Sequence, residues 1–164
     1  MDGLLSKLKK IRLVITDVDG VLTDGGLYYT EDGMVMKRFN VKDGMGTLLL
    51  REQKIKCGII STDKSSIITK RAERLKLDFV YTEIWDKKSQ MLELCKQYEI
   101  SSDNVAFIGD DVNDLDIIKS VGFSACPRDA VDKVAEIVDS VCTKNGGQGA
   151  FREFADLILS AHKK

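Results

Sequence analysis

The sequence predicts an α/β fold: a Rossmann-like parallel sheet with helices on both faces and a protruding β-hairpin. Short apolar runs of strand length alternate with helical patterns along the chain, which is typical of βαβ units. Two of these runs end in clustered aspartates, and one segment around residues 26–40 interrupts the alternation. With 164 residues, 43% of them hydrophobic, the chain is long enough to bury a core as one domain, residues 1–164.

The first strand is expected over residues 11–16, where branched apolar side chains follow one another without helical spacing, as in a strand buried on both faces. The basic stretch at residues 7–12 is expected to be a solvated lead-in. Asp17 and Asp19 follow the strand, and in an extended segment such residues point the same way, roughly 6.6 Å apart. Two anions so close repel each other, and a divalent cation is the usual remedy. The alternative is a solvated, Asp-rich turn.

A β-hairpin is expected within residues 26–40, where two strand-like runs flank an Asp-Gly turn. Its aromatic and methionine side chains suit an interface between subunits, where such residues are enriched. These side chains are Tyr28, Tyr29, Met34, Met36 and Phe39. The alternative is that they pack on their own domain.

The later elements follow from the same two periodicities. Apolar residues at helical spacing predict helices that each place one face against a sheet, over residues 43–53, 64–76, 87–99, 113–120, 129–137 and 150–162. Short apolar runs predict further strands over residues 56–60, 79–81, 105–108 and 123–126.

A second acidic cluster, Gly109-Asp110-Asp111-Val112-Asn113-Asp114, follows the apolar run at residues 104–108. Ligand sites in open α/β sheets lie beyond the carboxyl ends of the strands, so two strands that end in aspartates can pool them in one crevice. Such oxygen ligands suit Mg²⁺, which takes one or two carboxylates together with a substrate phosphate. For Asp114 the alternative is that it caps the following helix.

These two acidic segments resemble the first and fourth motifs of the haloacid dehalogenase superfamily, and the resemblance covers nearly the whole chain. Ser61 ends a strand as in the second motif, and Lys87 stands where the third motif places its lysine. More narrowly, residues 17–26, 39–46 and 146–154 resemble small phosphatases that act on 3-deoxy-octulosonate 8-phosphate and on nonulosonate 9-phosphates. The resemblance implies that the hairpin takes the place of a cap domain and that the subunits form a homotetramer.

The resemblance also implies a mechanism, Mg²⁺-dependent hydrolysis of a phosphate monoester through an aspartyl phosphate. Asp17 would be the nucleophile and Asp19 the acid and base. Ser61 and Lys87 would hold the phosphoryl oxygens. The ligands of Mg²⁺ would be Asp17, the backbone carbonyl of Asp19 and Asp110, with Asp111 and Asp114 behind them.

The expected substrate is a small sugar-acid phosphate. Asp63, Arg71 and Arg74 occupy places similar to the specificity set of the nonulosonate 9-phosphate enzymes, whereas the octulosonate enzymes usually have Gly-Arg at Thr62-Asp63. The sequence therefore favours the nonulosonate, although Arg71 and Arg74 could be solvated. The glycine-rich tail, residues 145–164, contributes Gly147 and Arg152, which by resemblance bind substrate in a neighbouring subunit; a flexible loop is the alternative.

Composition limits the other classes of function. The 25 basic and 26 acidic residues nearly cancel, so neither nucleic acid nor a membrane surface is an expected partner. The four cysteines form no CxxC pair and lie in or beside apolar segments, which predicts buried thiols in a cytoplasmic protein. Neither a signal peptide nor a membrane span is predicted. His162 is expected to be solvated.

Two alternative functions remain on the sequence alone. One is a non-catalytic oligomerisation module like the domain appended to CMP-sialate synthetases, which has lost catalytic acids that are present here. The other is a phosphomutase that uses the same aspartate pair, although such enzymes have a large cap.

Overall fold

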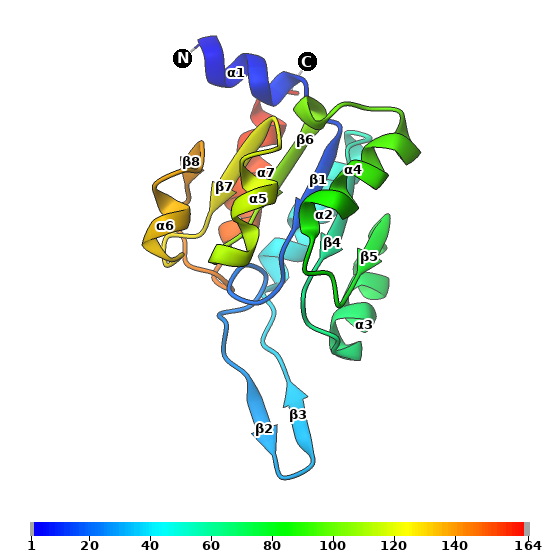
Figure 1. Ribbon diagram of the computed structural model, residues 1–164, viewed down its shortest axis with the longest axis vertical. Coiled ribbons are helices and arrows are strands. Elements are labelled where there is room, and N and C mark those ends of the chain that lie inside the picture. The colour runs from blue at the N-terminus through cyan, green and yellow to red at the C-terminus, as the bar shows by residue number, and fades with distance from the viewer. Residues whose placement is uncertain (1, 163–164) are drawn as a thin grey trace.

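The computed structural model describes residues 2–162 and contains a six-stranded sheet whose paired strands all run parallel (Figure 1). The strand order is β5-β4-β1-β6-β7-β8. The strands are β1 (Leu13–Thr16), β4 (Lys56–Ile60), β5 (Phe79–Tyr81), β6 (Val105–Ile108), β7 (Phe123–Cys126) and β8 (Ser140–Val141). The predicted Rossmann-like parallel sheet is confirmed, and β1 lies between β4 and β6, where the order of the strands reverses.

Helices cover both faces of this sheet, and each face has its own hydrophobic core. Val14 points into one core and its neighbours Leu13 and Ile15 into the other, as expected from the alternation of side chains along a strand. The first core includes residues of, or adjoining, α1 (Asp2–Lys9), α2 (Val41–Glu52), α3 (Ser66–Leu75) and α7 (Ala150–Ser160). The second includes residues of α4 (Lys87–Tyr98), α5 (Leu115–Ile118) and α6 (Asp132–Ala135).

Side-chain caps set where the longer helices begin. Asn40 accepts from the backbone N–H of Lys42 at 2.9 Å before α2, and Ser65 accepts from Ile67 at 3.2 Å before α3. Each cap satisfies a backbone donor that a helix leaves free in its first turn. Helix α3 therefore begins at Ser66, slightly later than its apolar spacing predicts.

Several predicted elements differ from the structure. In residues 7–12 the four basic side chains are exposed, as expected of a solvated lead-in, but the helix α1 extends to Lys9, and Leu8 and Ile11 are buried. The helices predicted over residues 113–120 and 129–137 are only the four-residue α5 and α6, and the short strand β8 has no predicted counterpart. A 3₁₀ turn, Val112–Asp114, precedes α5, because Asp111 and Asp114 cap the chain there. His162 is half-buried, with its Nε2 3.0 Å from the Leu8 carbonyl.

The predicted hairpin is formed by β2 (Tyr28–Thr30) and β3 (Gly33–Met36), and it projects from the end of the sheet opposite the termini (Figure 1). Tyr28, Tyr29 and Met36 are exposed, as an interface between subunits requires. Phe39 differs from that expectation, because it packs against the first core.

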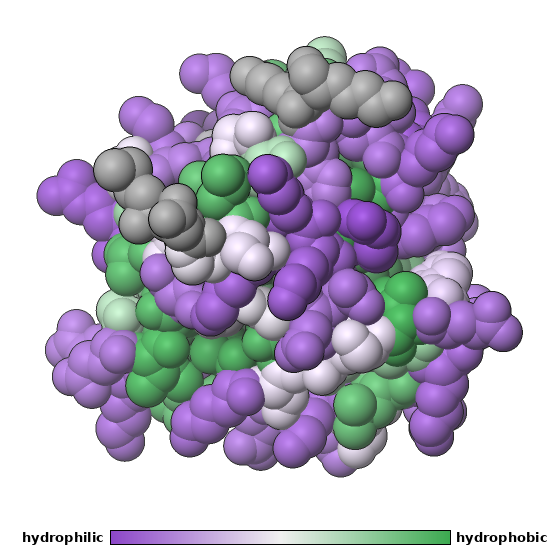
Figure 2. Space-filling model, turned by 90° about the horizontal axis from the view of Figure 1, so that it is seen from above, coloured by the Kyte–Doolittle hydropathy of each residue, from purple (hydrophilic) through white to green (hydrophobic). Residues whose placement is uncertain are grey.

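The face at the termini carries mixed polarity. At the end that bears the termini, hydrophilic side chains dominate and apolar ones show in separate patches (Figure 2). All four cysteines are buried and free, as predicted. Within residues 2–162, no helix combines the length and the apolar character needed to cross a bilayer.

Candidate active site

The site lies at the carboxyl edge of the three central strands. Thr16 of β1 is in register with Ile59 of β4 and with Ile108 of β6, so the residues that follow these strands emerge side by side. The surface has a hollow of about 290 Å³ there. It is lined by Asp17, Asp19, Gly20, Gly25, Thr62, Asp110, Asp111 and Asn113. The topology thus brings together the two acidic segments that the sequence placed after separate strands.

Lys87 is buried next to this hollow, in contact with Asp17. Its ammonium lies 2.9 Å from Oδ2 of Asp17 and 2.6 Å from Oδ1 of Asp114, and its side chain is 1% exposed. The other oxygen of Asp17 accepts from the backbone N–H of Val18 at 2.7 Å. Lys87 is the first residue of α4, which is capped by Asp86, whereas the neighbouring Lys88 points to solvent. The structure thus brings Lys87, and not Lys88, to the aspartates.

Three carboxylates crowd around this ammonium. Asp17, Asp110 and Asp114 each have an oxygen within 4.8 Å of the others. Burial, followed by the charges of Asp17 and Asp114, raises the pKa of Asp110 to about 8. Burial also raises the pKa of Asp17 to about 6, with Lys87 opposing this shift and Asp114 adding to it. The excess of buried anionic oxygens over one ammonium suits a hard divalent cation, so these residues fit Mg²⁺.

Asp114 and Asp111 have mainly structural contacts. Asp114 is fully buried, and its Oδ2 accepts from the backbone N–H of Asp110 at 3.0 Å while its Oδ1 binds Lys87. Asp111 is exposed and caps the 3₁₀ turn through the N–H of Val112. Asp114 therefore fixes both the loop that carries Asp110 and the lysine that faces Asp17.

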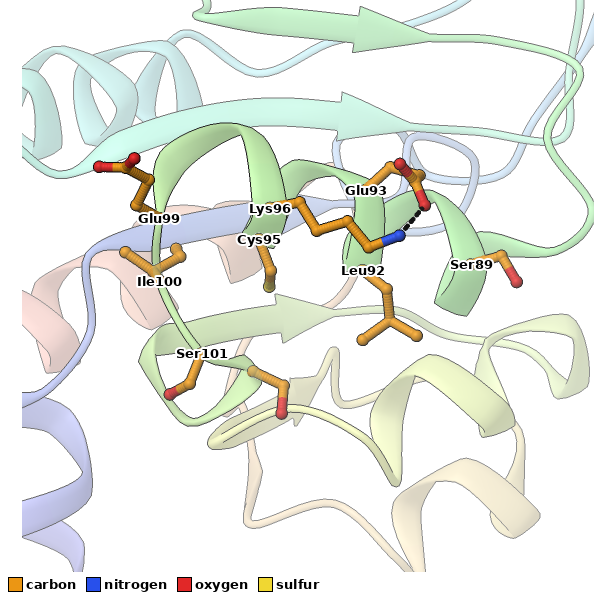
Figure 3. A pocket seen from close by; sticks show the side chains of 9 residues that line it. Ser89, Leu92, Glu93, Cys95, Lys96, Glu99, Ile100 and Ser101 are labelled. Carbon is orange, nitrogen blue, oxygen red and sulfur yellow. Dashed lines mark hydrogen bonds and ion pairs between the residues drawn. The ribbon is translucent and has the colours of Figure 1, made fainter.

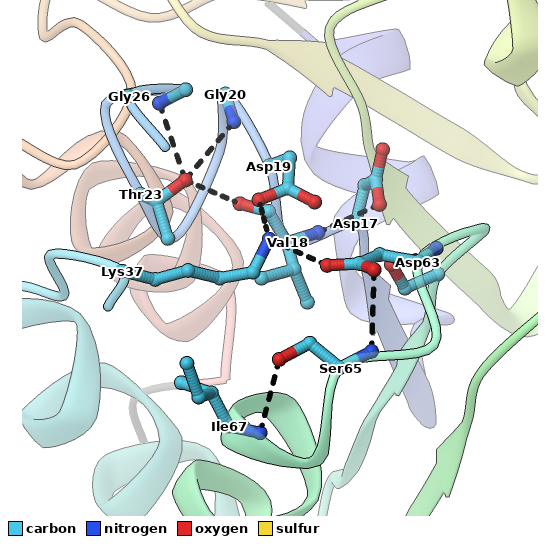
Figure 4. Close-up of polar contacts among 12 residues, drawn as sticks. Asp17, Val18, Asp19, Gly20, Thr23, Gly26, Lys37, Asp63, Ser65 and Ile67 are labelled. Atoms are coloured by element: carbon cyan, nitrogen blue, oxygen red, sulfur yellow. Dashed lines mark hydrogen bonds and ion pairs between the residues drawn. The ribbon is translucent and has the colours of Figure 1, made fainter. Parts of the chain in front are cut away.

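Sequence reasoning missed Lys37, which follows the hairpin strand β3. Its ammonium lies 2.5 Å from Oδ1 of Asp19 and 2.6 Å from Oδ2 of Asp63 (Figure 4). Burial disfavours the charged form, yet the hydrogen bonds to both carboxylates outweigh it, and the Lys37 pKa is raised. Oδ1 of the Asp19 carboxylate therefore faces this lysine, and the metal role that the resemblance implied falls on the Asp19 backbone carbonyl. No local pattern marks Lys37, because the contact forms only when the hairpin folds back.

The loop after Asp19 is held by Thr23, a second residue that sequence reasoning missed. Its buried hydroxyl accepts from the N–H of Gly20 at 3.3 Å and of Gly25 at 3.2 Å. Gly20 has φ +80°, and a Cβ there would lie 1.9 Å from Oδ2 of Asp110. Only glycine therefore lets this turn pass beside the carboxylate.

The residues predicted to read the substrate are in part engaged within the chain. Asp63 binds Lys37, and its N–H donates to the buried Ser61 hydroxyl at 3.2 Å. Arg71 donates to the Asn40 carbonyl at 3.4 Å and lies over the ring of Phe39, 5.4 Å from its centre. Arg74 points to solvent.

The glycine-rich segment packs on the chain's own active-site loop. Gly147 donates to the Val21 carbonyl at 2.9 Å, and a Cβ on Gly146 would lie 1.9 Å from the Gly20 carbonyl oxygen. Arg152 binds Asp156 on the same helix at 2.9 Å. Within one chain, Gly147 thus contacts the loop after Asp19, while Arg152 is turned along α7. Contact with a neighbouring subunit stays a prediction.

A larger hollow, of about 490 Å³, lies along α4 and the loop after it (Figure 3). Its charged residues, Glu93, Lys96 and Glu99, are exposed, and the first two pair with each other at 2.6 Å. It is open and lacks the converging buried groups that mark the smaller hollow, so we assign the chemistry to the latter.

Comparisons with known proteins agree with this geometry. The sequence profile of the haloacid dehalogenase-like hydrolases matches residues 46–153. The 3-deoxy-D-manno-octulosonate 8-phosphate phosphatase of Haemophilus influenzae is 39% identical over 158 residues, 96% of this chain and 88% of the relative. The phosphatase of the same name from Escherichia coli K12 is 35% identical over 161 residues, which are 98% of this chain and 86% of the relative.

Solved structures of such phosphatases superpose closely. The Moraxella catarrhalis enzyme, crystallised with magnesium, phosphate and KDO, has a TM-score of 0.94 and 34% identity, with 98% of this chain and 92% of that one covered. The Yersinia pestis enzyme has a TM-score of 0.95 and 35% identity, with 98% and 87% covered.

Proposed function

The chain belongs to the haloacid dehalogenase-like hydrolases and is a phosphatase, and on this premise we propose that it hydrolyses the phosphate monoester of a 2-keto-3-deoxy sugar acid. The observation that carries the proposal is the buried arrangement of Asp17, Lys87, Asp110 and Asp114 at the carboxyl edge of the sheet. The non-catalytic module is disfavoured, because a domain without chemistry has no need of crowded, buried carboxylates.

Asp17 would attack phosphorus and form an aspartyl phosphate, which water then hydrolyses. Its buried carboxylate is oriented by Lys87 and by the Val18 N–H, so little reorganisation precedes attack. Asp19 borders the same hollow and would protonate the leaving sugar oxygen, then take a proton from the attacking water. Lys87 would offset the negative charge of the transferring group, and the hydroxyl of Ser61 would hold one of its oxygens.

The proposed cofactor is Mg²⁺, held by the Asp17 carboxylate, the Asp19 carbonyl and Asp110. It would offset the charge of two anions that meet in the reaction. We also propose that the enzyme is a cytoplasmic homotetramer, a proposal supported by the free buried thiols and the exposed hairpin.

For the substrate, the relatives matched over nearly the whole chain are named for 3-deoxy-D-manno-octulosonate 8-phosphate, which supports the eight-carbon acid. The preference for a nonulosonate 9-phosphate rests on Asp63, Arg71 and Arg74, and two of these have partners within the chain. We therefore propose the octulosonate ester as the better substrate and retain the nonulosonate ester as its rival.

Phosphate release from both esters, with Mg²⁺ and with EDTA, tests the proposal. We expect a higher kcat/KM for the octulosonate ester and loss of activity in EDTA that Mg²⁺ restores. A higher kcat/KM for the nonulosonate ester would favour the Asp63, Arg71 and Arg74 hypothesis. Release from neither sugar-acid ester by the folded, Mg²⁺-loaded protein would contradict the proposed substrate class.

A further inference from the structure

We propose that Lys37 is a positioning residue that holds the carboxylate of Asp19 for proton transfer, and that Asp63 anchors Lys37 for this task. The inference rests on the proposed function, in which Asp19 protonates the leaving oxygen. It assigns Asp63 a role different from the substrate contact that its place in the sequence suggested.

The geometry joins three separate segments at one ammonium. Asp19 comes from the loop after β1, Lys37 from the arm of the hairpin and Asp63 from the loop after β4. The Lys37 side chain is fully buried, whereas those of Asp19 and Asp63 are 35% and 26% exposed. An ammonium held by two carboxylates at hydrogen-bond distance forms charge-assisted bonds, which are stronger than neutral ones.

Asp63 is itself fixed, which makes it suitable as an anchor. Its Oδ2 binds Lys37, and its Oδ1 accepts from the backbone N–H of Ser65 at 3.2 Å (Figure 4). Ser65 in turn caps α3 through the N–H of Ile67. The position of Lys37 is thus tied to the start of a helix rather than to a free loop.

Lys37 acts through Asp19 and not on the substrate. Asp19 lines the hollow beside Asp17 and Asp110, and the fully buried Lys37 lies behind it. A flexible carboxylate has several rotamers, and the hydrogen bond from Lys37 to Oδ1 restricts them in a side chain that lines the hollow. We infer that Lys37 selects the rotamer in which Asp19 reaches the leaving oxygen.

Two substrates whose leaving groups differ in basicity distinguish this role of Lys37 from a purely structural one. An alkoxide of a sugar acid requires a proton as it leaves, whereas p-nitrophenolate is a stable anion that does not. Because kcat/KM reports the steps up to transfer of the phosphoryl group, it depends on Asp19 as an acid but not on the later hydrolysis. Lys37→Met should lower kcat/KM for the sugar-acid phosphate by about 10²-fold, the lower range for general acid catalysis, and change it little for p-nitrophenyl phosphate.

Three controls complete the design. Arg38→Met removes a cation from the neighbouring, exposed position and should leave both substrates unaffected. Asp63→Asn retains Lys37 and Asp19 but weakens the ion pair that holds Lys37. It should therefore lower kcat/KM less than Lys37→Met does, and again only for the sugar-acid phosphate. This variant tests the inference if Lys37→Met does not fold. In an Asp19→Asn background, Lys37→Met should cause no further loss, because its effect passes through that carboxylate.

The inference would be overturned if folded Lys37→Met and Asp63→Asn lost kcat/KM equally for both substrates. It would also be overturned if the loss caused by Lys37→Met added to that caused by Asp19→Asn. In either case the phosphatase proposal stands. Absence of phosphate release by the wild-type enzyme from both substrates would instead contradict the proposed function, and the inference with it.

Discussion

At the scale of single residues, Lys87 links Asp17, the proposed nucleophile, to the loop that carries Asp110. It binds the buried side chains of Asp17 and Asp114, and the Lys87 pKa is raised because the attraction of the two carboxylates outweighs the effect of burial. Removing one partner of a buried ion pair leaves an uncompensated charge, which is more damaging than losing an exposed pair. Substitutions around Lys87 therefore combine effects on stability with effects on catalysis.

Asp17→Asn and Asp19→Asn are expected to fold and to lose activity. Each replaces a carboxylate with an amide of the same shape, so packing is retained while the proposed nucleophile or the proposed acid is lost. We expect at least about a 10²-fold loss of phosphate release from the sugar-acid ester in either variant. Asp32→Asn, at the exposed tip of the hairpin, is the matched control and should be silent. Wild-type-like turnover in Asp17→Asn would contradict the mechanism.

Asp110→Ala and Asp114→Ala should separate the roles of the two carboxylates. Asp114→Ala breaks the buried pair with Lys87 and should lower the free energy of unfolding by about 3–5 kcal/mol. Asp110→Ala removes an anion from a crowded cluster, so the metal-free protein should stay folded but lose its response to Mg²⁺. At a concentration of 100 Kd, Mg²⁺ should stabilise the wild type by about 2.7 kcal/mol.

Thermal unfolding with EDTA and with Mg²⁺ measures both effects. Equal stabilisation of the wild type and Asp110→Ala by Mg²⁺ would place the metal elsewhere.

Asp43 gives a prediction for pH. Burial raises its pKa from 3.8 to about 6, although Arg152 donates its N–H to Oδ1 at 2.9 Å. The folded state therefore favours protonated Asp43, and this contribution to stability is present below pH 3.8 and lost as the pH rises through 6. The free energy of unfolding of the wild type relative to Asp43→Asn should fall by up to about 3 kcal/mol between pH 4 and 7.

Urea unfolding of both proteins across this range measures the difference, in which the other titrating groups cancel. A difference that does not change with pH would show that Asp43 titrates normally.

At the scale of elements, the start of the C-terminal segment and the active-site loop are packed backbone against backbone. A Cβ on Gly146 would lie 1.9 Å from the Gly20 carbonyl oxygen, so Gly146→Ala must displace the loop that carries Asp19. We expect a lower kcat with a smaller change in KM, because the acid is moved more than the binding groups. Gly3→Ala, where a Cβ meets nothing within 4 Å, is the control. Steady-state kinetics of the two variants test this coupling, and unchanged kcat in Gly146→Ala would exclude it.

Helix α7 is part of the core rather than a detachable tail. Phe151, Phe154 and Ile158 are buried, and truncating a single buried phenylalanine typically costs about 3–5 kcal/mol. Deleting everything after Lys144 would therefore unfold the protein and reveal nothing about the glycine segment. Point substitutions such as Gly146→Ala are the informative experiment.

At the scale of the whole molecule, the projecting hairpin supports the prediction of a homotetramer. Leu27, Tyr29, Val35 and Met36 are exposed apolar residues on an element that covers little of its own domain. Tyr29→Glu together with Met36→Glu should lower the mass measured by light scattering, because charges become buried at the interface. Glu31→Gln, an exposed change on the same hairpin, should leave it unchanged. A monomeric wild type would contradict the proposed assembly.

Local sequence patterns are enough to predict every strand of the sheet except β8, most of the helices and the two acidic segments. Strand and helix periodicities are local, so the runs before Asp17 and Asp110 predicted both strands and the edge at which they end. The structure has a shorter α5 than the apolar spacing predicts, because Asp111 and Asp114 cap a 3₁₀ turn at its start. Helix α6 is also shorter than predicted.

Which charges meet depends on the tertiary fold. Lys37 and Asp63 are distant in sequence and share no periodic pattern, so their pairing with Asp19 arises when the hairpin arm folds back on the loops after β1 and β4. Arg71 likewise contacts residues distant in sequence, because its partners Asn40 and Phe39 come just before α2 whereas Arg71 lies on α3. Residue types and their spacing restrict local conformation, whereas long-range ion pairs depend on how the helices, strands and loops pack. The packing therefore determines the partners of Lys37 and Lys87.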